Sequence, residues 1–138
     1  MNSIKAFIVL GTLLMSSFAM AQGCVDEKGN DVLNDPGIFT EVIARKETCH
    51  EAIDLAKACA WGASVDYTTT SIAMTVCSYH LEKLSPKEAD MNLLRAMIDR
   101  CEANHDADGG TMAISETGFC RLSAYEFVYK MYRPQDVF

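Results

Sequence analysis

The residues that could carry out a reaction in this chain are three histidines, six cysteines and 19 acidic residues. Nucleophilic catalysis needs a base beside the nucleophile, but His50, His80 and His105 are scattered along the sequence. Glycoside hydrolysis needs two carboxyl groups that flank a cleft, and with so many acids some pair of carboxyls is expected by chance. The sequence therefore predicts no catalytic residue and no enzyme.

A metal site is the other chemistry that these residues suggest. The run from Asp106 to Gly110 begins like a calcium loop, but its sixth position is Thr111 instead of glycine. Its twelfth position is Thr117 instead of the usual glutamate. We therefore expect no calcium here.

Two Cys/His pairs could begin a zinc site. They are Cys77 with His80 and Cys101 with His105, but neither has a second close pair to complete a tetrahedral site. We expect no metal and no other cofactor.

The N-terminal 21 residues resemble a secretory signal peptide. Lys5 precedes the uncharged, largely apolar run Ala6–Ala19, and Ala19-Met-Ala21 matches the exit site of a signal peptidase. The alternative is a membrane anchor, for which this run is short. We expect export to the periplasm, cleavage after Ala21, a single domain over residues 22–138, and no membrane association after cleavage.

The six cysteines all follow the predicted cleavage site, and an even number in a small exported domain predicts three disulfides. Six cysteines allow 15 pairings. In one continuous helix, Cys49 and Cys59 would lie ~15 Å apart, too far for a bond. Disulfides that clamp neighbouring elements across a break are favoured instead. The resulting pairing is Cys24–Cys49, Cys59–Cys77 and Cys101–Cys120.

Apolar residues recur at helical spacing along most of the remaining chain, which predicts an all-α fold, a small disulfide-bonded bundle of four to five helices. One or two helices cover residues 36–61. Pro36 marks the first start, and Thr48 with Glu51 has the form of a capping box. A further helix begins near Thr68, although its β-branched start would also suit a strand.

The second half of the chain gives clearer helix boundaries. Ser85-Pro-Lys-Glu88 combines a cap, a proline and a closing glutamate, which predicts a helix start. Residues 105–110 are expected to form a loop, followed by a last helix over 111–132.

The net charge of −7 limits the partners. Cleavage would remove Lys5, the only charge in residues 1–21, so the mature chain would carry −8. Such a chain disfavours nucleic acid and anionic lipid, and it favours a basic protein.

Cys101 and Cys120, with Gly109-Gly110 between them and an Arg/Tyr/Lys-bearing helix after them, resemble the C-terminal half of the LprI-like lysozyme inhibitors. The segment from Cys59 to Cys77 resembles the first cysteine pair of that family, with wider spacing. The likeness covers about half of the mature chain. The signal, size, helices and cysteines together also resemble the periplasmic immunity proteins that block peptidoglycan hydrolases delivered by type VI secretion. Both resemblances imply a protein that binds and blocks a lysozyme-like enzyme.

Two segments are candidates for contact with such a partner, a cognate secreted muramidase or another peptidoglycan hydrolase. The first is the break in periodicity that holds Trp61, Asp66 and Tyr67, whose aromatic rings and carboxylate would plug a sugar-binding cleft. Its alternative is that Trp61 belongs to the core.

The second candidate segment is the loop with His105, Asp106 and Asp108, whose alternative is a solvated turn. Two further alternatives concern the whole protein. Tyrosines of the last helix could form a homodimer face, and the chain could be an envelope-binding or folding-helper module without a hydrolase partner.

Overall fold

The computed structural model describes residues 24, 25, 29, 32 and 36–134, without the side chains of 36–37 and 105–108. The predicted signal peptide, residues 1–21, lies outside the described residues. The described chain forms an all-α bundle with three disulfides, as predicted. Its helices are α1 (Pro36–Ala44), α2 (Cys49–Ala58), α3 (Val65–Lys83), α4 (Glu88–Asp108) and α5 (Thr111–Tyr132).

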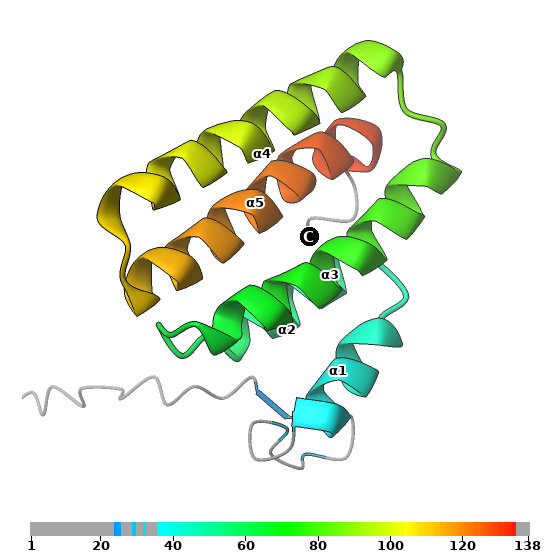
Figure 1. Ribbon diagram of the computed structural model, residues 1–138. Helices are drawn as coiled ribbons and strands as arrows, with labels where there is room; N and C mark the ends of the chain where they lie inside the picture. Colours follow the sequence, from blue (N-terminus) through cyan, green and yellow to red (C-terminus); the bar gives the residue numbers. More distant parts are fainter. Residues whose placement is uncertain (1–23, 26–28, 30–31, 33–35, 135–138) are drawn as a thin grey trace, which may run out of the picture.

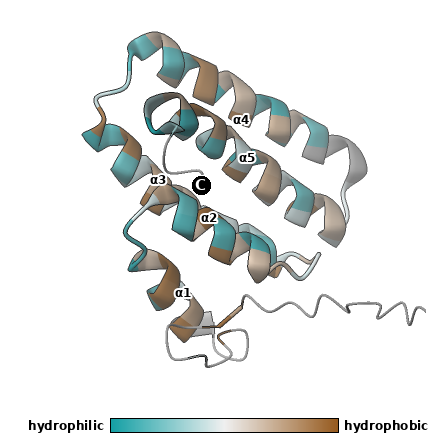
Figure 2. Ribbon diagram, turned by 180° about the vertical axis from the view of Figure 1, so that it is seen from behind, coloured by the Kyte–Doolittle hydropathy of each residue, from teal (hydrophilic) through white to brown (hydrophobic). Residues whose placement is uncertain are grey.

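The three long helices form a row in which α5 lies between α3 and α4 (Figure 1). Helix α2 packs against α3 and α5, and α1 packs against α3 and α2. Apolar residues dominate α1, which appears mostly brown in Figure 2, because Glu41 is its only charged residue. Burial of its Phe39 and Ile43 joins this short helix to the core.

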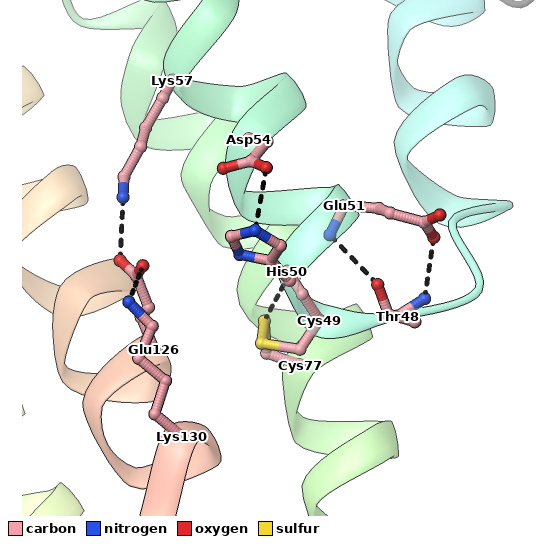
Figure 3. Close-up of polar contacts among 9 residues, drawn as sticks. All are labelled: Thr48, Cys49, His50, Glu51, Asp54, Lys57, Cys77, Glu126 and Lys130. Carbon is pink, nitrogen blue, oxygen red and sulfur yellow. Dashed lines mark hydrogen bonds and ion pairs between the residues drawn. A yellow bond between two sulfur atoms is a disulfide. The ribbon is translucent and has the colours of Figure 1, made fainter. Parts of the chain in front are cut away.

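Two helices, and not one, cover residues 36–61. The Thr48 hydroxyl accepts a hydrogen bond from the Glu51 amide, and the Glu51 carboxylate accepts one from the Thr48 amide, both at 3.1 Å (Figure 3). This reciprocal capping box satisfies two amide groups that a helix start leaves unpaired, so α2 begins afresh after α1 has ended.

The predicted start of α4, with Ser85 as the cap and Pro86 as the first helical residue, is two residues too early. Ser85 has a φ of +50°, and its amide donates to the Glu82 carbonyl, so it terminates α3. Helix α4 begins at Glu88 and is capped from another helix: the Tyr132 hydroxyl accepts from the Lys87 amide at 2.8 Å and donates to Asp90. The hydrogen bond to Asp90 raises the pKa of Tyr132, against the opposing effect of the Lys87 amide.

The predicted loop over residues 105–110 is also too long. Helix α4 continues to Asp108, and only Gly109 and Gly110 separate it from α5. Gly109 has a φ of +59°, the left-handed conformation with which helices commonly end. The predicted last helix, 111–132, is confirmed.

The pairing Cys101–Cys120 is confirmed, and the other two predicted pairings are wrong: the bonds are Cys24–Cys59 and Cys49–Cys77. The reason is the packing of α2 against α3. Cys59 lies at the end of α2, whereas Cys77 lies ~18 Å along α3 from its first residue. Cys49, at the other end of α2, is the neighbour of Cys77 instead.

The buried side chains form two clusters. The larger cluster contains two of the disulfides and joins α1, α2, α3 and α5. The smaller consists of Leu81, Leu94, Ala124 and Val128 and holds α4 against α5. In α5, Tyr125 packs against both clusters and Tyr129 is buried, so both side chains belong to the interior of the protein. Tyr129 is therefore not available to a homodimer face, and the predicted homodimer itself stays a prediction.

An ion-pair network joins α2 to α5. The Glu126 carboxylate, whose side chain is 14% exposed, accepts from Lys57 at 2.8 Å and from Lys130 at 2.7 Å (Figure 3). Burial opposes ionisation of Glu126, but hydrogen bonds from Lys130 and Lys57, with their positive charges, outweigh it. Together they hold the pKa of Glu126 below its ordinary value.

This network makes part of the stability depend on pH. Because folding lowers the pKa of Glu126, its contribution is complete above the ordinary glutamate value of about 4.3 and is lost as the pH falls through the folded value. We expect Glu126→Gln to lower the melting temperature by ~4 °C at pH 7. The difference between the two proteins should shrink steadily in melts below pH ~4.3. A constant difference across that range would contradict the assignment.

Candidate partner-binding surface

A buried carboxylate organises the connection between α2 and α3. Asp66, in the first turn of α3, is 0% exposed. Its two oxygens accept hydrogen bonds from the amides of Trp61 (2.9 Å), Gly62 (2.8 Å) and Ala63 (3.1 Å). The hydroxyl of Ser115 in α5 donates a fourth bond at 2.6 Å. A buried charge is tolerated when its hydrogen bonds are made, and these four meet that condition.

The prediction that Asp66 contacts a partner is therefore wrong in its physical premise, because the carboxylate faces into the protein and not into solvent. Sequence reasoning placed Asp66 in a non-helical break that ends at Tyr67. The helix in fact begins at Val65, and the break covers only residues 59–64. Asp66 is thus a helix residue that turns back to hold the preceding loop.

Trp61 projects from this fixed loop. It is 61% exposed, so the alternative in which it completes the core is wrong. Gly62 follows with a φ of +71°, a conformation that side chains rarely adopt, and its amide points at Asp66. The main-chain amides thus hold the loop in place, and the side chain of Trp61, the only tryptophan of the protein, takes no part in these hydrogen bonds.

Tyr67 lies on the other side of Asp66 in sequence and is 39% exposed. Its hydroxyl accepts a hydrogen bond from Arg121 at 2.5 Å, and the Arg121 guanidinium lies 5.1 Å from the ring centroid. Arg121 also pairs with Glu102 of α4 at 3.5 Å. Tyr67 therefore joins three helices at the surface, and only part of its ring remains available to a partner.

The closeness of α3 and α5 at this end depends on Gly118. A Cβ at that position would lie 2.5 Å from the Thr70 hydroxyl and 3.4 Å from the Tyr67 Cα. The Thr70 hydroxyl itself donates to the Asp66 carbonyl at 2.8 Å. No side chain longer than hydrogen fits between the two helices here without moving the turn that carries Asp66.

The two predicted contact segments lie at the same end of the bundle. The α2–α3 and α4–α5 connections are both on the left in Figure 1, and the bond from Ser115 to Asp66 joins the helices that follow them. His105, Asp106 and Asp108 belong to the last turn of α4, and their side chains lie outside the described part of the protein. Their predicted contact with a partner stays a prediction.

Sequence reasoning missed two hollows on α3 that meet at Ile72. The wide hollow, of about 650 Å³, is lined by Ala44, Lys46, Glu47, Ile72, Thr75, Val76, Tyr79 and His80. The narrow one, of about 60 Å³, is lined by Val32, Phe39, Thr40, Cys59, Trp61, Val65, Thr68, Thr69 and Ile72. The seven-residue spacing of Val65, Ile72 and Tyr79 was the signal that could have revealed this surface.

Within the described residues, no group of three or more His, Cys, Asp or Glu side chains could hold a metal ion. In the same part of the chain, no helix is long and apolar enough to cross a membrane. Comparison of the chain with protein-family models, curated proteins and solved structures finds no match.

The separate roles of Trp61 and Asp66 predict effects of very different size on stability when each is replaced by alanine. Trp61→Ala should change the free energy of unfolding by less than about 0.5 kcal/mol, because most of the side chain is already in water. Asp66→Ala should cost about 3 kcal/mol, because three amides and one hydroxyl lose their acceptor. Urea unfolding of both variants measures the difference, and equal losses would contradict these roles.

Gly118→Ala tests the close approach of α3 and α5. In an open helix, this change would stabilise the protein by up to about 1 kcal/mol. Here we expect a loss of about 1–3 kcal/mol, because the new methyl group displaces Thr70. Gly110→Ala is the control for a Cβ without a steric clash, since it meets nothing within 4 Å and its φ is −107°. Because Gly110 is the N-cap of α5, this change should cost only the preference of that position for glycine over alanine, less than about 1 kcal/mol. A gain in stability for Gly118→Ala would show that the helices separate freely.

Proposed function

We propose that this protein is an exported inhibitor of a lysozyme-like peptidoglycan hydrolase, acting in the periplasm as an immunity protein against a type VI secretion effector. The observation that carries the proposal is an exposed tryptophan on a loop that a buried carboxylate holds rigid. Three disulfides suit an oxidising compartment outside the cytoplasm.

Inhibition would follow from insertion of Trp61 into the substrate cleft. A cleft that binds sugar rings offers flat apolar surfaces, on which an indole ring can pack. Because the loop is already fixed by Asp66, its insertion loses little conformational entropy on binding. A tryptophan side chain has no glycosidic bond, so the hydrolase cannot cleave it, and the inhibitor needs no catalytic residue of its own.

The charge of the protein supports a basic partner. The net charge of −7 attracts a cationic hydrolase over long range and speeds association more than it tightens the complex. Asp66 contributes nothing to this contact, since its carboxylate is satisfied internally. Asp106 and Asp108, in the last turn of α4 at the same end of the bundle, are the proposed polar contacts.

One structural observation favours the alternative, an envelope-binding or folding-helper module. Such a module needs an open apolar surface, and the wide hollow between the α1–α2 connection and α3 is one. The hydrolase inhibitor remains the stronger proposal because it also explains the rigid tryptophan loop.

Inhibition can be measured with protein exported from its full-length precursor and purified with its disulfides intact. We expect a stoichiometric complex with a muramidase on size exclusion and arrest of peptidoglycan hydrolysis in a turbidity assay. Trp61→Ala should weaken inhibition at least tenfold, equivalent to about 1.4 kcal/mol. Phe127→Ala, which removes a half-exposed aromatic of α5, is the matched control and should inhibit normally. Failure to inhibit any muramidase, above all one encoded beside this gene, would refute the proposal.

A further inference from the structure

Helix α3 carries an uncharged seam on its outer side, apolar except for two threonines. The seam consists of Val65, Thr68, Ile72, Thr75 and Tyr79, which recur at alternating steps of three and four residues. Ile72 is partly buried and the other four are exposed. None of the five is charged, and the charge beside the seam is the Lys83 ammonium, which lies 3.9 Å from the centroid of the Tyr79 ring. The five seam positions themselves therefore lack the charges that a solvated face usually carries.

The spacing of the seam is that of a coiled coil. A narrow stripe with a seven-residue repeat is the surface on which a second helix packs, by inserting its side chains between those of the first. From Val65 to Tyr79 the seam is ~21 Å long, which corresponds to four turns. None of the described helices occupies it, because Val65 and Tyr79 are 46% and 56% exposed.

The two hollows lie along this seam and give it the form of a groove. Val65, Thr68 and Ile72 line the narrow hollow, and Ile72, Thr75 and Tyr79 line the wide one. The facing wall of the narrow hollow comes from Val32 and α1, and that of the wide hollow from the end of α1 and the α1–α2 connection. The two hollows share Ile72, and together they extend from Trp61 at one end to Tyr79 at the other.

We infer that this groove binds an amphipathic helix of a partner protein, with apolar residues at seven-residue spacing and a basic polar face. The apolar side of such a helix would fill the two hollows, and Ile72 would lie at the centre of the contact. The charges of Lys46 and Glu47 in the lining oppose each other, so the preference for a basic over an acidic polar face comes from the net charge of the whole chain, −7.

The lining of the groove fits a small polar or amphiphilic ligand less well than it fits a helix. Such sites combine apolar walls with polar groups that point at the ligand. In this groove the hydroxyls of Thr69 and Thr75 donate to the carbonyls of Val65 and Ser71 in their own helix. The charged residues Lys46 and Glu47 stand side by side at the wide end with opposite signs, and they give no net attraction for an ionic head group.

The groove extends the surface assigned to hydrolase binding, because Trp61 lines its narrow end. The assignment of this helix to the hydrolase rests on the proposed function. The preference of the groove for an amphipathic helix with a basic polar face is independent of it. Binding of helical peptides without inhibition of any muramidase would therefore overturn the function and leave the groove intact.

A panel of stapled 18-residue helices tests the inference on the full exported protein. Each peptide carries leucine at coiled-coil spacing in one of three registers, with lysine, or in the acidic set glutamate, at the remaining positions. Trp61 is the only tryptophan, so its emission reports binding at the groove directly. We expect a blue shift with micromolar affinity for a lysine peptide and at least tenfold weaker binding of its glutamate counterpart.

Val65→Arg and Leu93→Arg form a matched pair of variants, since the two residues are 46% and 41% exposed and lie on α3 and α4. Val65→Arg should weaken peptide binding at least tenfold, Leu93→Arg should not change it, and both should retain the helical circular dichroism of the unchanged protein. Absence of binding by every peptide, or equal weakening by both variants, would overturn the inference.

Two other molecules could fill the groove, and each would give a different experimental result. Concentration-dependent dimers that Val65→Arg abolishes, seen by sedimentation equilibrium without peptide, would assign the groove to a second copy of this chain. A blue shift with dodecanoate but with no peptide would assign it to an amphiphile. Either result would overturn the inference.

Discussion

The carboxylate of Asp66 is the constraint on which the end of the bundle that carries Trp61 depends. A charge removed from water must find hydrogen-bond donors inside the protein, and the nearest donors are the amides of the preceding loop and the Ser115 hydroxyl. Meeting that need folds the loop back over the start of α3 and draws α5 against it. Gly118 permits the resulting approach, and Trp61 is left outside as the exposed residue of a loop that cannot easily rearrange.

The disulfides support the same arrangement, because Cys59 is the first residue of the loop that Asp66 holds. Cys24–Cys59 and Cys49–Cys77 are buried and fasten both ends of α2, one to the N-terminal segment and one to α3. Each closes a long loop, which restricts the unfolded chain and adds about 3 kcal/mol to stability. Cys101–Cys120 differs, because Cys120 is exposed. It clamps α4 to α5 at the surface, where the shared core is small.

Local signals in the sequence predicted local structure well. The capping box at Thr48 and the last helix over 111–132 were both readable, because each depends on residues within one or two turns. Disulfide pairing failed at Cys59 and Cys77 because it depends on how α2 crosses α3. Asp66 was misread for a similar reason: an aspartate beside a glycine-containing break usually faces water, and only the approach of α5 buries this one. The groove was missed because its second wall comes from α1.

The hydroxyl of Tyr132 couples the order of synthesis to the order of folding. The first turn of α4 receives its cap from a residue 45 positions further along the chain. While the chain emerges residue by residue, α1, α2 and α3 can already pack together, but α4 lacks its cap until α5 is complete. Such a distant contact forms late, since the intervening chain must first be brought together. The second half of the bundle is therefore expected to fold as one hairpin onto a first half that is already in place.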